Sequence, residues 1–183
     1  MEFLDSCIVG CKVFTPSLFG DNRGLFYEMW NQSAFINNGI DYVFVQDNIS
    51  TSLKGVLRGI HTQLKYPQAK IVSCLGGAIF DVAVDCRPQS PTLGKWYGEV
   101  LSQDNHKQLL IPEGVAHGFY TLEDAMVFMK VTTHYTPGDE IGFMWNDSEV
   151  GIEWPHGINP ILAEKDKKWG SFSDMIKVLE DYR

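Results

Sequence analysis

The sequence predicts a mainly β protein, folded as a double-stranded β-helix jelly roll with a few short helices. Between residues 9 and 141 the chain consists mostly of short alternating or apolar runs, which Gly, Pro, Asn and Asp interrupt. Hydrophobic residues make up 44% and aromatic residues 13% of the 183 residues, which is enough for one compact core. No linker, internal repeat or low-complexity segment divides the chain, so residues 1–183 are expected to form a single domain.

The elements follow from local patterns along the chain. Ser33 is the expected N-cap of a first short helix that stops at Gly39. Residues 42–48 are predicted to form a strand whose period of two turns Gln46 and Asn48 to the same face as two aromatic residues, so this face should line a cavity. Further strands are expected at residues 69–75, 78–86, 97–101, 108–111 and 125–135, and a terminal packing helix at residues 173–182.

One strand-like stretch places an imidazole among cations. Arg58 and His61 lie in otherwise apolar sequence, and Lys70 follows shortly after. An imidazole moves protons near neutral pH, and neighbouring cations suit an anionic substrate such as a phosphate ester. Residues 58 and 61 have opposite strand parity, so a bulge must bring both into one pocket, and Gly59 permits it. For His61 alone, a satisfied core histidine is the alternative interpretation.

Charge and composition exclude several partners. The formal net charge of −8 disfavours nucleic acid and anionic membrane surfaces, so any anion site must be local. No apolar run approaches the roughly 20 residues that span a bilayer. Residues 1–5 lack the parts of a signal peptide, and a cytoplasmic location is expected. The four cysteines have no C-x-x-C spacing, so the sequence indicates neither a zinc site nor a redox pair, and Cys74 and Cys86, in apolar strands, are expected to be buried reduced thiols.

A set of segments in a fixed order covers nearly the whole chain. These segments are residues 19–28, 46–48, 58–61, 80–85, 90–92, 111–119, 145–147, 154–155, 160–162 and 165–166. Taken together, they resemble the dTDP-4-dehydrorhamnose 3,5-epimerases of the cupin superfamily. The resemblance implies a nucleoside diphosphate 4-keto-6-deoxyhexose as substrate, whose C4 carbonyl acidifies the hydrogens on C3 and C5, and it implies no cofactor.

The resemblance also implies roles for individual residues. His61 matches the general base, Asp166 the carboxylate that pairs with it, and Lys70 the cation that faces the C4 oxygen. Arg23 and Arg58 match a diphosphate clamp, for which a guanidinium fork is well suited. The positions that correspond to the rest of the nucleotide, diphosphate and sugar pocket are Phe19, Phe26, Glu28, Gln46, Asn48, His117, Tyr135 and Lys165.

A homodimer with exchanged amino-terminal strands is a further implication of the resemblance. Some of Phe19, Arg23, Phe26 and Glu28 would then complete the site of the partner subunit, and a monomer would be inactive.

One position departs from the family pattern. The family carries a tyrosine there, which acts as the acid that reprotonates carbon from the far face, whereas this chain has Met129. A thioether has no proton to give. His134 has the opposite strand parity to Met129 and is not expected to replace the tyrosine, whereas Tyr135 shares that parity. In the family this acid is expected to matter most at C5, so the resemblance implies epimerisation at C3, with reprotonation by water or another group, and slow or absent inversion at C5.

Three alternatives belong to other functional classes. The pattern Pro112-x-Gly114-x-x-His117 resembles the second motif of metal-dependent cupins, but Gln63 stands where a second histidine ligand would be needed. A non-catalytic sugar-nucleotide-binding protein would not require a base, a carboxylate and a lysine together. A 3,4-ketoisomerase of the same fold stays open and would yield a 3-keto product. The nucleotide base, whether of a dTDP, CDP or GDP sugar, also stays open.

Overall fold

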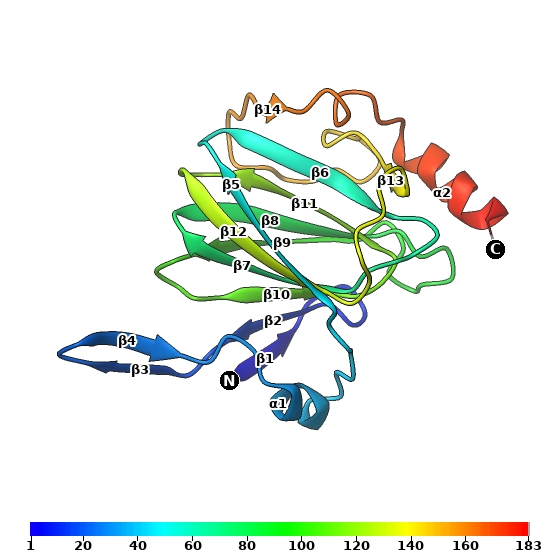
Figure 1. Ribbon diagram of the computed structural model, residues 1–183. Coiled ribbons are helices and arrows are strands. Elements are labelled where there is room, and N and C mark those ends of the chain that lie inside the picture. The colour runs from blue at the N-terminus through cyan, green and yellow to red at the C-terminus, as the bar shows by residue number, and fades with distance from the viewer. Residues whose placement is uncertain (183) are drawn as a thin grey trace.

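The computed structural model describes residues 1–182 and consists of two facing sheets (Figure 1). The first sheet contains, in spatial order, β1 (Glu2–Asp5), β2 (Lys12–Thr15), β10 (Gln108–Ile111), β7 (Lys70–Gly76), β12 (Ala125–Val131) and β5 (Gln46–Ser52). The second contains β13 (Glu140–Gly142), β6 (Val56–Gln63), β11 (Val115–Thr121), β8 (Ala78–Asp85) and β9 (Trp96–Ser102), with β14 (Ile161–Leu162) parallel to β6. The crossovers between non-consecutive strands confirm the predicted jelly roll.

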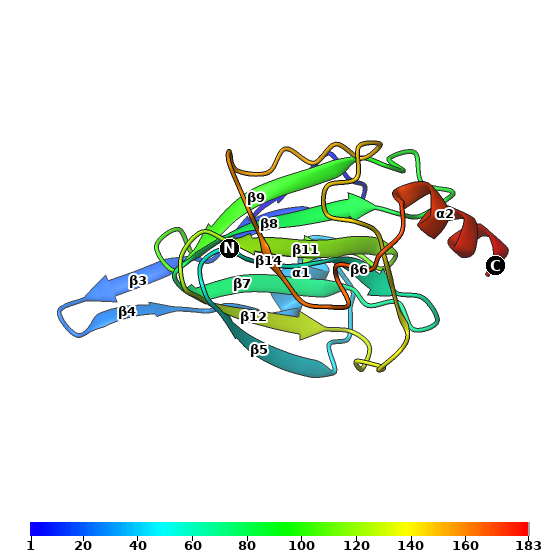
Figure 2. The same ribbon diagram turned by 90° about the horizontal axis from the view of Figure 1, so that it is seen from above.

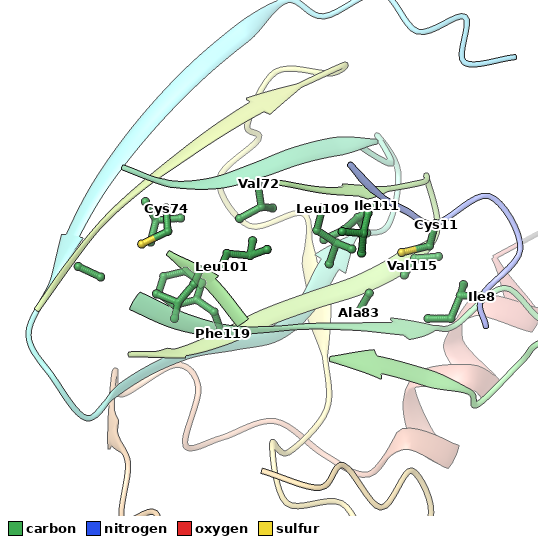
Figure 3. Packing of buried hydrophobic residues seen from close by; sticks show 14 residues of the cluster. Ile8, Cys11, Val72, Cys74, Ala83, Leu101, Leu109, Ile111, Val115 and Phe119 are labelled. Atoms are coloured by element: carbon green, nitrogen blue, oxygen red, sulfur yellow. The ribbon is translucent and has the colours of Figure 1, made fainter. Parts of the chain in front are cut away.

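The main core fills part of the space between the sheets (Figure 3). Val72 and Leu109 point inward from the first sheet, and Leu101 and Phe119 from the second. Burial of each such side chain contributes about 1.5–3 kcal/mol, because apolar surface leaves water. A polar cavity occupies the part of the interior that lies between β5, β12 and β7 on one side and β6 and β11 on the other.

A bulge in β6 brings residues of opposite strand parity to one side of the sheet. His61 pairs with His117 on β11, whereas Arg58 pairs with Phe119, so β6 holds one extra residue between these two pairs. Gly59 lies in this stretch with a φ of +107°, and a Cβ there would approach the carbonyl oxygen of His117 to 2.5 Å. The bulge predicted at Gly59 is therefore confirmed, and glycine is required for both its φ and its lack of a side chain.

Both helices begin two residues or fewer from their predicted positions. Helix α1 (Gln32–Asn37) has Asn31 as N-cap, whose side chain accepts a hydrogen bond from the Ala34 N–H at 3.1 Å. The prediction of Ser33 as N-cap was wrong because asparagine caps equally well and comes first. Helix α2 (Phe172–Asp181) starts after Ser171, which forms a capping box with Asp174.

Two predicted strand boundaries were wrong. Residues 42–45 precede β5 as coil, although their burial alternates as predicted, and Tyr42 and Phe44 pack against a small aromatic cluster beside α1 instead. Strand β12 ends at Val131 rather than at Tyr135, because the Thr132 hydroxyl accepts the Ala69 N–H and the chain leaves the ladder. Residues 134 and 135 therefore lie outside the strand, and strand parity does not determine the direction of their side chains.

A two-stranded hairpin extends away from both sheets, as Figures 1 and 2 show. It is formed by β3 (Leu18–Asp21) and β4 (Gly24–Tyr27), in which Phe19 is the direct partner of Phe26. Both rings are exposed, Phe26 to 71%. Within residues 1–182, no helix combines the length and the apolar character needed to cross a membrane.

Candidate active site

The polar cavity has a volume of about 310 Å³ and collects most of the residues that the sequence analysis singled out. Its wall on the first sheet includes Lys70 from β7 and Met129 from β12. Its wall on the second sheet includes His61 from β6 and its cross-strand partner His117 from β11. The other predicted residues that line the cavity are Gln46, Asn48, Arg58, Tyr135, Lys165 and Asp166.

His61 is held as a neutral imidazole. Burial, followed by the positive charges of Lys70, Lys165 and His117, lowers its pKa well below the ordinary value of 6.5. Its Nε2 lies 3.2 Å from Oε1 of Glu140, and its buried Nδ1 has no hydrogen-bond partner in the part of the chain that is described. A neutral imidazole can accept a proton at pH 7.

Asp166 lines the same cavity but is not joined to His61. Its side chain is buried, at 2% exposure, and Oδ1 accepts a hydrogen bond from the Trp169 indole at 3.2 Å. Burial raises the pKa of this carboxyl, while the hydrogen bonds from Trp169 and the Gly59 N–H oppose the rise. Among residues 1–182 no hydrogen bond or ion pair connects Asp166 with His61, and the carboxylate that contacts the ring is Glu140. The pairing of Asp166 with His61 stays a prediction.

Lys70 brings a cation into the cavity from the opposite sheet. The residue is 7% exposed, and burial lowers its pKa from 10.5 to about 8, against the opposing effect of Glu140 and Asp81. Within the described chain its ammonium has no hydrogen bond or ion pair. The group is therefore mostly charged at pH 7 and free to bind an anion that forms in the cavity.

Two acidic residues of the site were missed by the sequence analysis. Asp81 lies 2.7 Å from Nε2 of His117 and is fully buried within the apolar strand β8. Glu140 lies at the start of the three-residue strand β13, directly after a turn. Nothing in the local sequence distinguishes Glu140 from a surface acid. A carboxylate in an apolar run was the one available signal for Asp81.

Cations at the edge of the cavity provide a local site for an anion in an acidic protein. Arg58 is exposed and is oriented by bonds from Nε to the Ser52 hydroxyl at 3.0 Å and from Nη2 to the Thr51 carbonyl. Lys165 is exposed and binds both oxygens of Glu140, at 2.8 and 2.7 Å. The Gln46 amide connects two further parts of the lining, because it donates to Asn48 and accepts the N–H of Tyr135.

Four predicted residues do not line the cavity of their own chain. Phe19, Arg23 and Phe26 lie on the projecting hairpin, where the Arg23 guanidinium pairs with Asp21. Glu28 follows the hairpin and accepts a hydrogen bond from Asn31. Within residues 1–182 no group of three or more His, Cys, Asp or Glu side chains is arranged to hold a metal ion.

The fold and the lined cavity together are those of a jelly-roll enzyme of the cupin type. A family model described as dTDP-4-dehydrorhamnose 3,5-epimerase matches residues 5–174. The chain belongs to this family, and it is an isomerase that acts on carbohydrates.

Individual relatives match this chain over almost its whole length. The dTDP-4-dehydrorhamnose 3,5-epimerase of Escherichia coli (strain K12) is 48% identical over 181 residues, which cover 97% of this chain and 98% of that protein. The dTDP-6-deoxy-D-glucose-3,5-epimerase of Legionella pneumophila, in complex with dTDP-4-keto-L-rhamnose, has a TM-score of 0.91 at 42% identity and matches 94% of this chain and 93% of its own. A 3′-monoepimerase from Streptomyces bikiniensis, in complex with dTDP-quinovose, has a TM-score of 0.89 at 30% identity. The match covers 94% of this chain and 89% of that protein.

Proposed function

We propose that this protein epimerises a dTDP-4-keto-6-deoxyhexose at C3, and that inversion at C5 is slow or absent. One observation carries the proposal: a neutral imidazole, His61, and an unpaired ammonium, Lys70, face the same cavity from opposite sheets. The relatives named above support the substrate class, because one of them is a complex with a dTDP-4-keto sugar.

The reaction needs a base and a group that stabilises an enolate. His61 takes the proton from C3, and the electron pair of the C–H bond moves toward the C4 oxygen. Lys70 stabilises the resulting oxyanion, since a cation in a largely buried site acts more strongly than it would in water. Return of a proton to the opposite face of C3 restores the ketone with inverted configuration. Arg58 and Lys165 at the edge of the cavity bind the diphosphate.

The proposed restriction to C3 rests on Met129, because in this fold the acid on the far face matters most for inversion at C5. This residue lines the cavity on the wall opposite His61, and its sulfur cannot donate a proton to the far face of the sugar. Relatives of this fold include 3,5-epimerases and a 3′-monoepimerase, so the fold itself is compatible with restriction to C3. Water or another group on that wall reprotonates C3.

The projecting hairpin supports the proposal of a homodimer with exchanged amino-terminal strands. Phe19 and Phe26 are large apolar rings that no other part of the described chain covers, and exposed apolar patches of this kind mark contact surfaces. In the dimer, some of Phe19, Arg23, Phe26 and Glu28 complete the nucleotide site of the partner. The four free cysteines suit a reducing compartment, and we place the reaction in the cytoplasm.

Product analysis tests the proposal. Purified protein is incubated separately with the dTDP, CDP and GDP forms of the 4-keto-6-deoxyglucose sugar, and the products are identified by proton NMR. We expect a C3-inverted 4-keto sugar from the dTDP form. A 3-keto product would instead identify a ketoisomerase. No reaction with any of the three, or stoichiometric iron, manganese or nickel in the active protein, would contradict the proposal.

A further inference from the structure

One buried amide joins the segment that follows β6 to the segment that follows β12. Gln63, the last residue of β6, is 4% exposed. Its Nε2 donates hydrogen bonds to the Tyr66 carbonyl at 2.7 Å and to the His134 carbonyl at 3.3 Å. Its Oε1 accepts the N–H of Thr136 at 2.8 Å. The amide therefore binds the backbone of both segments with its nitrogen and its oxygen.

The residue between the two bonded positions is Tyr135, which lines the cavity. Gln63 binds the backbone directly before it, at His134, and directly after it, at Thr136. Gln46 from β5 accepts the N–H of Tyr135 itself at 3.0 Å. The backbone is thus held from both sheets, whereas the residue is 49% exposed and its hydroxyl has no hydrogen bond within the described chain. A fixed backbone with a free ring suits contact with a ligand.

Further bonds join the two segments at some distance from Tyr135. Asp139 accepts the N–H of Tyr66 at 3.0 Å, and the Thr132 hydroxyl accepts an N–H at the end of the segment after β6 at 2.9 Å. These bonds hold the ends of the segment after β12. Within residues 1–182, Gln63 is the one side chain that bonds the backbone on both sides of Tyr135. Removal of its amide should therefore loosen Tyr135 while the ends stay in place.

Gln63 cannot act on a substrate directly. Its side chain does not line the cavity, and both of its N–H groups are used by carbonyls. An amide suits this place because one planar group donates to carbonyls and accepts from an N–H, whereas a carboxylate would repel the two carbonyl oxygens. The position at which a metal-dependent cupin would need its second histidine thus holds a side chain that binds backbone.

We propose that Gln63 is a positioning residue of the nucleotide site, which holds the Tyr135 ring against the bound nucleotide and controls affinity through that ring. The inference rests on the proposed function and on the nucleotide contact that the family resemblance implies for Tyr135. Loss of the amide lets the backbone around Tyr135 move, so the ring contacts the nucleotide for less of the time. His61 and Lys70 do not depend on this amide for their position, so the effect falls on binding.

A double-mutant cycle, measured by calorimetric titration with thymidine diphosphate, tests the inference. We expect Gln63→Met and Tyr135→Ala each to weaken binding about tenfold, the order of one lost stacking contact. The double variant should bind little more weakly than Tyr135→Ala, because the amide then has no ring to position. Losses that multiply to about a hundredfold in the double variant, or wild-type affinity in either single variant, would overturn the inference.

Kinetics and a matched control separate positioning from a general loss of stability. Gln63→Met should raise KM about tenfold while kcat changes less than about threefold. Thr92→Val is the control, because Thr92 is also buried and also holds a loop, through the Asp85 carboxylate and the Val9 N–H, but does not line the cavity. Its affinity for thymidine diphosphate should stay within about twofold of wild type. A tenfold loss in Thr92→Val, or a lower kcat with unchanged KM in Gln63→Met, would contradict the inference.

Hydrogen exchange of the free protein tests the positioning without a ligand. The Thr136 amide should exchange about tenfold faster in Gln63→Met, because its acceptor is lost, and an unchanged rate overturns the inference. Wild-type protein that binds no thymidine diphosphate contradicts the proposed function instead, and exchange still decides whether Gln63 fixes the segment. If Gln63→Met folds poorly, Gln63→Glu, which loses the donors but keeps the length, should weaken binding at least about threefold, and wild-type affinity in it would overturn the inference.

Discussion

His61 and Lys70 approach one cavity from opposite sheets of the jelly roll, and neither is anchored by the other. An enolisable sugar ring placed between the two sheets would therefore meet a base on one side and a cation on the other. The same burial that lowers the pKa of the imidazole keeps it neutral, and the buried ammonium lacks a protein partner that would compete with the substrate. Rate, pH dependence and stability should all reflect this arrangement.

The pH dependence of kcat/KM should be bell-shaped with a broad top. Activity requires neutral His61, whose pKa lies well below 6.5, so the rate falls only as the solution becomes distinctly acidic. Activity also requires charged Lys70, so the rate should fall about tenfold per pH unit above the Lys70 pKa of about 8. Initial rates measured from pH 4 to pH 10 check this. A rate that stays constant up to pH 10 would show that Lys70 is not the required cation.

Replacement of Lys70 should increase stability while it abolishes activity. A buried ammonium without a partner destabilises the folded state. The free energy of unfolding of Lys70→Met should therefore be about 1 kcal/mol or more higher than that of the wild-type protein, which corresponds to roughly 2–4 °C in Tm. The folded-state pKa is depressed, so the cost is fully present below about pH 8 and is lost as the pH rises toward 10.5. The gain should therefore shrink over that interval. Calorimetry at pH 7 and pH 10 measures both effects, and a lower Tm for the variant at pH 7 would refute the argument.

Gly59 should tolerate no side chain. In Gly59→Ala the new Cβ would clash with the His117 carbonyl oxygen at 2.5 Å. The alanine would also have to keep a φ of +107°. We expect a loss of about 3 kcal/mol or more in unfolding free energy, together with lost activity. Gly157→Ala is the control, since Gly157 also has a positive φ but no atom within 4 Å of the added Cβ, and it should cost only about 1 kcal/mol. Equal urea midpoints for the two variants would contradict this account of the bulge.

The sequence predicted what depends on local pattern and missed what depends on pairing between distant strands. Alternation and turn residues predicted the sheets, and the parity of Arg58 and His61 predicted the bulge between them. The contact of Glu140 with His61 arises only because β13 pairs with β6 in one register, and no local signal reports that register. Helix starts were misplaced where two residues could cap, as with Ser171 and residue 173, and only the formed hydrogen bonds decide between them.

Met129→Tyr should add turnover at C5. A phenol at this position of β12 would restore a proton donor on the wall opposite His61. Met126→Tyr on the same strand is the control, because Met126 is exposed and does not line the cavity. We expect the 3,5-inverted product from Met129→Tyr and not from Met126→Tyr, by proton NMR. The absence of any C5 inversion in Met129→Tyr would mean that more than a proton donor distinguishes this site.

Deuterium incorporation tests the central claim most directly. The dTDP-4-keto-6-deoxyglucose substrate is incubated in deuterated water with wild-type protein, His61→Asn and the exposed-site control His156→Asn, and exchange at C3 and C5 is followed by NMR. We predict rapid incorporation at C3, little at C5, a loss of at least 1,000-fold in His61→Asn by the order of a removed general base, and no loss in His156→Asn. Exchange at C5 as fast as at C3 in the wild-type protein, or undiminished exchange in His61→Asn, would contradict the account.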